Sequence, residues 1–271
     1  MFAGYNRYTV GLGLMARLAG IPAPARRLVG SALRSVPGAT WERAYAALGG
    51  GGGVRLPGQK AAKLARLLSS PSPADMYRTL LSAWDRPERF LAPSCAEWDP
   101  IRDALAEEGR ELSLAAMQFV DQRYYLPDDL LQKVDRASMA VSLEARVPLL
   151  DHRIVEFSWR LPDDLKVRDG QSKWLLRQVL YRHVPRELVE RPKVGFSTPI
   201  EAWLLGPLRS WAEDLLLGGS VGSGAVFDRV VVGQTWRRFL GGRTEHALGL
   251  WAIAIFEAWR RRWRLEGALE V

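Results

Sequence analysis

Apolar residues recur with the period of an α-helix along most of the 271-residue chain. Positions three and four residues apart lie on one face of a helix, so this spacing predicts amphipathic helices that each bury one face. No convincing strand alternation or internal repeat is present. The pattern predicts a mainly α protein. The expected helices cover residues 2–19, 24–35, 40–48, 58–69, 73–83, 99–109, 112–125, 199–217, 227–240 and 245–265.

A run of five glycines at 49–53 interrupts this pattern. A phosphate-binding loop of this composition needs a strand before it, a helix N-terminus after it and a Lys-Ser/Thr pair close by. The run is followed instead by Val54-Arg55-Leu56-Pro57-Gly58. Such a sequence is typical of a flexible connector.

Ionisable residues concentrate among apolar ones between 125 and 199. A helix expected to begin at Pro127 carries Lys133, Asp135 and Arg136 on adjacent turns. A charged group among apolar side chains needs a partner or a ligand. Asp135 and Arg136 therefore belong either to a structural ion pair or to a binding site.

The segment Glu144-Ala145-Arg146-Val147-Pro148-Leu149-Leu150-Asp151 follows that helix. Arg146 stands two residues before a proline, which disfavours helical geometry. Its planar guanidinium can bind a carboxylate or a phosphate through two parallel hydrogen bonds. Glu144 and Asp151 are the local carboxylates that it could pair with, and such pairing would be structural.

Two lysines give the sharpest chemical signal. Lys173 follows an Asp169-Gly170 turn and opens a helix, where the helix dipole disfavours a cation unless an anion shares the site. Lys193 stands in a turn stiffened by Pro192. If the two ammonium groups meet, they would neutralise a leaving pyrophosphate; otherwise they are solvated surface lysines.

Composition narrows the classes of function. The net charge of +8 favours a polyanionic partner, but no helix-turn-helix, zinc-finger or RNP-like signature is present, so we expect no nucleic acid partner. The single cysteine, Cys95, excludes a disulfide framework and suits a reducing cytoplasm. No apolar run approaches the roughly 20 residues that span a bilayer, and no signal peptide follows Met1, so we expect no membrane association.

Three strings carry a family resemblance. YLPDDLLQKVDRASMAVSLEARVPLLD from Tyr125, a KxxLR helix from Lys173, and RPKxGFSTP from Arg191 followed by Trp203 resemble the synthetase domain of glutamine-dependent asparagine synthases. The opening FAGYNRY is similar to the segment that follows the acidic SGxGxDE motif of that family. HALGLWAIAIFEAW is similar to its closing helix. The resemblance spans nearly the whole chain and is most specific between 125 and 199.

The resemblance implies that residues 1–271 are part of a synthetase domain. This part would be the helical C-terminal portion of an adenine-nucleotide α-hydrolase-like (PP-loop ATP pyrophosphatase) α/β domain whose parallel sheet is largely missing. A full-length member binds ATP, Mg²⁺ and aspartate and forms β-aspartyl-AMP with release of pyrophosphate. Ammonia from glutamine, made in a separate N-terminal domain, then displaces AMP. By resemblance, Lys193 and Lys173 are the catalytic cations, and Asp135, Arg136 and Arg146 belong to the substrate and pyrophosphate pocket, with no metal ligand assigned.

Parts of the family pattern are missing. The glutaminase nucleophile is a cysteine directly after the initiator methionine, and Phe2 stands there; no SGGxDS loop occurs. We therefore expect a fragment that binds no cofactor tightly, does not turn over alone, and exposes the apolar helix faces that would pack on the sheet. A homodimer is compatible with the full-length family. Two alternatives stay open: a related amide-forming ligase of the β-lactam synthetase or lasso-peptide cyclase type, and a non-catalytic helical binding module.

Overall fold

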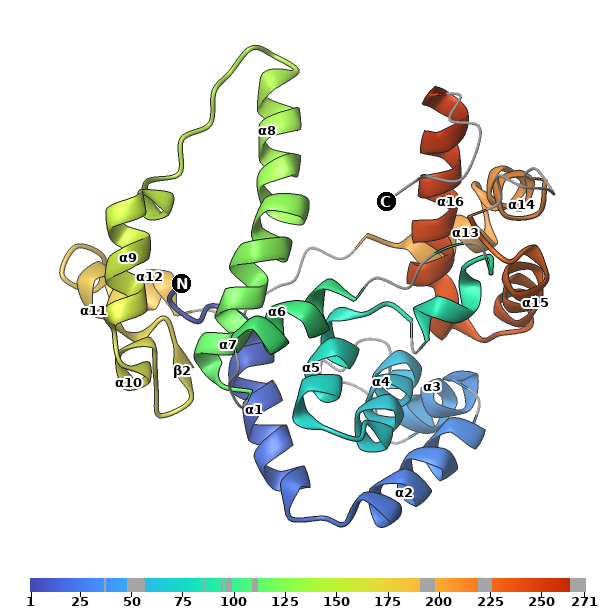
Figure 1. Cartoon of the computed structure of the whole chain (residues 1–271), viewed down its shortest axis with the longest axis horizontal. Coiled ribbons are helices and arrows are strands. Elements are labelled where there is room, and N and C mark those ends of the chain that lie inside the picture. The colour runs from blue at the N-terminus through green and yellow to red at the C-terminus, as the bar shows by residue number, and fades with distance from the viewer. Residues whose placement is uncertain are drawn as a thin grey trace. The chain divides into compact units, whose positions relative to one another are not determined.

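The computed structural model describes residues 1–36, 38–47, 57–84, 86–93, 95, 99–108, 112–190, 198–218 and 226–263. It is mainly helical, as the sequence predicted (Figure 1). The chain divides into two compact units. Unit 1 comprises Met1–Gly20 and Asp99–Gly195, and unit 2 comprises Ile21–Trp98 and Phe196–Val271. The glycine run at 49–53 and Lys193 lie outside the described residues.

A long helical rod runs through unit 1. Ser113 begins it, because its hydroxyl accepts a hydrogen bond from the Ala116 N–H and so caps the first turn. Leu114, Met117 and Val120 are almost fully buried, which confirms the buried helix expected from residue 112 onward. The rod consists of α7 (Leu114–Val120), η2 (Asp121–Leu131) and α8 (Gln132–Met139).

The helix that was expected to begin at Pro127 instead passes through this residue. Residues 121–131 have π-helical geometry, and the Gln132 N–H donates to the carbonyl of Pro127, five residues back. A proline in an α-helix loses one hydrogen bond and clashes with the carbonyl four residues earlier. The wider π turn moves that carbonyl away, so the rod continues. Such turns are rare and are found preferentially at functional sites.

A short β-hairpin lies between α10 (Asp163–Lys166) and α11 (Trp174–Leu180) in unit 1. Val167 pairs with Ser172 and Arg168 with Gln171, while Asp169 (φ 50°) and Gly170 (φ 75°) form the two-residue turn. Two successive positive φ values are those of the type I′ turn that Asp-Gly favours. The sequence predicted this turn but not its strands, because two residues are too few to show alternation. The further elements of unit 1 are α1 (Asn6–Ala19), α6 (Pro100–Glu108), η3 (Pro148–Leu150), α9 (His152–Arg160), α10 (Asp163–Lys166), β1 (Val167–Arg168), β2 (Gln171–Ser172), α11 (Trp174–Leu180) and α12 (Arg186–Val189).

Unit 1 exposes a set of large apolar side chains on α8 and the segment after it. Val141 is 75% exposed and Leu143 is 63% exposed. The described residues leave these apolar side chains exposed. Faces of this kind mark contact surfaces. The set is Val134, Met139, Val141, Leu143, Val147 and Leu149.

Unit 2 has its core around α16 (Ala247–Trp263), and α13, α14 and α15 pack around this helix (Figure 1). Trp236, Phe239 and Leu250 are fully buried there. A Cβ on Gly249 would lie 2.0 Å from Cε2 of Trp84, so the indole ring packs where only glycine fits. The other elements are α2 (Ala23–Ser35), α3 (Gly38–Ala47), α4 (Pro57–Ser69), α5 (Pro73–Leu81), η1 (Pro87–Phe90), α13 (Ile200–Leu205), α14 (Arg209–Leu217), α15 (Arg229–Leu240) and η4 (Thr244–His246).

Unit 2 differs from the sequence prediction at one helix and agrees with it at another. The helix expected over 199–217 is two helices, because α13 ends at Leu205, with Gly206 as its C-cap, and Pro207 follows. The closing helix buries part of its surface in the core, as expected for core packing. Among the described helices, none is both long and apolar enough to cross a membrane.

Candidate active site

Lys173 is held in an unusual backbone conformation between the hairpin and α11. Its φ of 56° and ψ of 34° are left-handed, and it occupies the position just before the first helical turn, without a side-chain capping bond. Non-glycine residues seldom adopt this conformation. Arg177 fixes the junction, since its N–H donates to the Lys173 carbonyl (2.9 Å) and its Nε donates to the Ser172 carbonyl (3.0 Å). Two hydrogen bonds of Arg177 thus fix the backbone at Lys173 between the hairpin and α11.

The side chain of Lys173 lies along the backbone of the N-terminal segment. A Cβ built on Gly4 would be 2.3 Å from Cε and 3.2 Å from Nζ of Lys173. Ala3, one residue earlier, is fully buried and also has a positive φ, of 53°. Strained residues of this kind cluster at functional sites. We call the group formed by Ala3, Gly4 and Lys173 the Lys173 site.

A buried ion pair anchors the N-terminal segment beside this site. Asp121 accepts hydrogen bonds from Nε of Arg7 (3.1 Å) and from the Tyr8 hydroxyl, and its ion pair with Nη2 of Arg7 measures 2.7 Å. The guanidinium also lies over the rings of Tyr5 (4.4 Å) and Tyr125 (4.5 Å). Cation–π contacts of this kind strengthen when water is excluded. The network ties α1 to the start of η2, and so it holds Gly4 at the Lys173 side chain.

Tyr5 gives this network a pH dependence. Burial, with smaller contributions from Tyr125 and Asp121 against the opposing charge of Arg7, raises the pKa of Tyr5 to about 12. The unfolded value is about 10, so the folded state binds this proton more tightly. We expect its stabilising contribution to be complete below about pH 10 and to be lost as the pH rises toward 12. Ultraviolet titration should show one late tyrosine that disappears in Tyr5→Phe; titration of every tyrosine near pH 10 would contradict this.

Lys166 is a buried lysine that the sequence did not single out. It is 2% exposed, and its Nζ donates to Oε1 of Gln118 at 3.2 Å. Burial lowers the pKa of Lys166, with Asp163 opposing. Gln118 in turn donates to the Met1 carbonyl at 2.5 Å. The apolar neighbours Leu165 and Val167 were the available signal in the sequence.

The other residues expected in the pocket lie on the surface of unit 1. Asp135 and Arg136 are exposed on α8, and Arg146 donates to both carboxylate oxygens of Glu144, at 3.0 and 3.1 Å, while 83% of its side chain is exposed. Among the described residues, no hydrogen bond or ion pair joins Asp135, Arg136 or Arg146 to Lys173. Lys173 thus contacts the N-terminal segment, and the described residues show no direct bond from it to these three side chains. Lys193 lies outside the described residues.

Comparison with known proteins decides the family. The family model for asparagine synthase matches residues 1–261, which include every element named above except the last two residues of α16. The chain belongs to the asparagine synthase family. The Lys173 site and its anchoring network therefore lie within an asparagine synthase domain.

Individual relatives agree with this assignment. Asparagine synthetase (glutamine-hydrolysing) 1 of Bacillus subtilis is 29% identical over 167 residues, covering 62% of this chain and 26% of the relative. A putative asparagine synthetase of Mycobacterium tuberculosis H37Rv is 36% identical over 172 residues, covering 62% and 24%. The asparagine synthetase of Gallus gallus is 42% identical over 128 residues, covering 44% and 21%. The matched part is about a quarter of each relative, and no solved structure matches the chain.

Proposed function

We propose that this chain supplies the helical, pyrophosphate-facing part of an ATP-dependent asparagine synthase. One observation carries the proposal: the ammonium of Lys173, in a strained backbone conformation, is held against Gly4. A lysine at the start of a helix is opposed by the helix dipole, so its placement does not serve helix stability. A departing anion that shares the position would account for it.

The proposed reaction has two steps. A β-carboxylate oxygen of aspartate attacks the α-phosphorus of ATP, and the bond between this phosphorus and the bridging oxygen breaks as pyrophosphate leaves with its negative charge. The nitrogen of ammonia, released from glutamine elsewhere in the whole protein, then attacks the acyl carbon, and AMP leaves as a proton is lost from nitrogen. Lys173 and Lys193 would oppose the charge that grows on the leaving groups, which is how a fixed cation lowers a barrier.

The remaining assignments belong to the same proposal. Asp135 and Arg136 of α8, with Arg146 of the segment after it, would join the substrate pocket where the nucleotide-binding part of a PP-loop α/β domain would pack. Mg²⁺ would bind the phosphates of ATP. Among the described residues no three His, Cys, Asp or Glu side chains gather to hold a metal. We place the reaction in the cytoplasm.

The test uses the longest protein that the reading frame encodes. Aspartate-dependent pyrophosphate release should fall about 100-fold in Lys173→Ala, the effect of removing one preorganised group that stabilises developing charge. Glutamine hydrolysis should be unchanged. Lys133→Ala is the matched control, since Lys133 is an exposed cation paired with Asp129 at 2.8 Å on the same unit. Undiminished pyrophosphate release in Lys173→Ala would remove this residue from the mechanism.

A further inference from the structure

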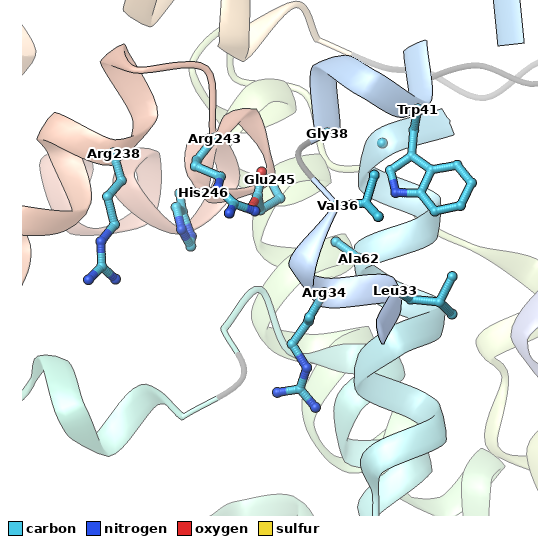
Figure 2. Close-up of a pocket in the computed structure, with 11 residues that line it drawn as sticks. Leu33, Arg34, Val36, Gly38, Trp41, Ala62, Arg238, Arg243, Glu245 and His246 are labelled. Carbon is cyan, nitrogen blue, oxygen red and sulfur yellow. The ribbon is translucent and has the colours of Figure 1, made fainter. Parts of the chain in front are cut away.

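Unit 2 contains a cavity of about 540 Å³, well within the size range of small-molecule sites (Figure 2). None of the residues proposed for asparagine synthesis lines it. Two of its three lining arginines lie apart from its apolar side chains. Figure 2 shows Arg238, His246 and Arg243 toward one end, and Trp41, Leu33 and Ala62 toward the other. The lining residues thus fit a ligand with one charged end and one apolar end.

The charged end carries more positive than negative groups. Arg238 and Arg243 line it, and Nη1 of Arg243 lies 3.6 Å from Oε1 of Glu245, the one carboxylate among the lining residues, while Arg34 lies next to Leu33. The pKa of His246 reflects these charges. Burial lowers this pKa, and Arg238, Arg243 and Arg66 lower it further, while Glu245 opposes them. The imidazole stacks on Trp84, with ring centroids 5.8 Å apart. An anion at this end would meet more positive than negative charge.

Two helices also begin at the cavity. Gly38 is the first residue of α3, and Gly58 is the second residue of α4. A Cβ on Gly58 would lie 2.8 Å from the Gly38 carbonyl oxygen, so the two backbones meet closely. Neither helix has an acidic residue in its first turn. Both N-terminal dipole ends therefore add to the positive field.

One lining residue carries a buried donor with no acceptor. The indole Nε1 of Trp41 is buried, and no described residue accepts its hydrogen bond. Buried donors of this kind are normally paired, and leaving one unpaired costs about 1–3 kcal/mol. An oxygen of a bound ligand could accept this bond. Trp41, Leu33 and Val36 would then enclose the apolar part of the same ligand.

We propose that this cavity binds a small organic anion, a carboxylate or phosphate ester joined to an apolar or aromatic body. The anionic end meets Arg238 and Arg243 beside His246, and the apolar end lies against Trp41. The site is separate from the one proposed for synthesis and goes beyond that function.

His246 is the reporter for the test. The chain has three histidines, and His152 and His183 are exposed residues of unit 1 that serve as internal references. With labelled histidine in the 271-residue chain, NMR titration identifies His246 by its loss in His246→Gln. Phenyl phosphate should raise the pKa of His246 by about 1, because a nearby negative charge favours the imidazolium. Benzyl alcohol should leave it unchanged, and inorganic phosphate should act at least tenfold more weakly than phenyl phosphate.

Two variants should move the affinity for phenyl phosphate in opposite directions. Arg238→Gln should weaken binding about tenfold or more, because a hydrogen bond to a charged group usually contributes at least this much to affinity. Glu245→Gln should strengthen it several-fold, because the competing carboxylate is gone. Arg237→Gln is the control, an exposed neighbour that does not line the cavity. No response of His246 up to about 10 mM phenyl phosphate, equal weakening by Arg237→Gln, or an equal effect of inorganic phosphate would overturn the proposal.

Discussion

Lys173→Asn is expected to make the protein more stable and less active at the same time. The left-handed conformation of Lys173 costs a non-glycine residue roughly 1–2 kcal/mol, and asparagine tolerates it far better. The melting temperature should therefore rise by about 2–4 °C, as expected for a gain of about 1 kcal/mol in a domain of this size. Pyrophosphate release should fall about 100-fold because the ammonium is lost.

Asp169→Asn is the matched control for this trade-off. Asp169 also has a positive φ, of 50°, but it is exposed in the hairpin turn and does not belong to the Lys173 site. This variant should change stability little, because aspartate and asparagine both tolerate the left-handed conformation, and it should keep full activity. Thermal unfolding and a pyrophosphate assay on both variants make the comparison. A Lys173→Asn protein that is destabilised or fully active would contradict the account.

Gly4→Ala should perturb the Lys173 site through the N-terminal segment, without changing the lysine itself. The added methyl would overlap Cε of Lys173, which is the end of a flexible and exposed side chain. The lysine can move aside, so stability should change by less than about 1 kcal/mol, while displacement of the ammonium should lower activity about tenfold. Gly13→Ala is the control, because a Cβ added at Gly13 would have no atom within 4 Å.

Asp121→Asn is expected to produce the largest loss of stability in unit 1. Asp121 and Arg7 are 6% and 18% exposed, and the ion pair joins segments 114 residues apart. Removing the carboxylate charge takes away the counter-charge of the buried Arg7 guanidinium, and breaking a buried pair in this way costs about 3–5 kcal/mol. The midpoint of urea unfolding should fall accordingly. Release of α1 would also free Gly4 from Lys173, so activity should fall with stability.

The control for this prediction is a solvent-exposed pair on the same helical rod. Asp129 and Lys133 are 42% and 67% exposed, so Asp129→Asn should cost less than about 1 kcal/mol. Replacing both buried partners, in Arg7→Met with Asp121→Leu, should recover most of the loss, since neither charge then stays unpaired. Equal destabilisation by Asp121→Asn and Asp129→Asn would show that the buried pair is not the anchor.

Local sequence rules predicted most of the helices, because each depends on residues a few positions apart, but they did not predict α9 (His152–Arg160). They placed the Asp169-Gly170 turn and the helix that follows Lys173. They failed at Pro127, where the rod continues through a π turn, and at Gly206, where one expected helix is two. Both errors come from backbone geometry that the apolar period does not encode.

The site was predicted only in part for a related reason. Lys173 could be chosen because a cation at a helix start violates a local rule. Its contact with Gly4, and the pairing of Arg7 with Asp121, depend on segments more than 100 residues apart, and no local pattern relates them. The strained φ of Lys173 likewise becomes visible only in three dimensions.

A double-mutant cycle on aspartate-dependent pyrophosphate release tests most directly whether Lys173 and Lys193 act together on one departing pyrophosphate. When two groups act together, the effects of removing each are not additive. Lys173→Ala with Lys193→Ala should therefore lower the rate by clearly less than the product of the two single losses. Single losses that simply multiply, or single variants that release pyrophosphate at the unaltered rate, would contradict it.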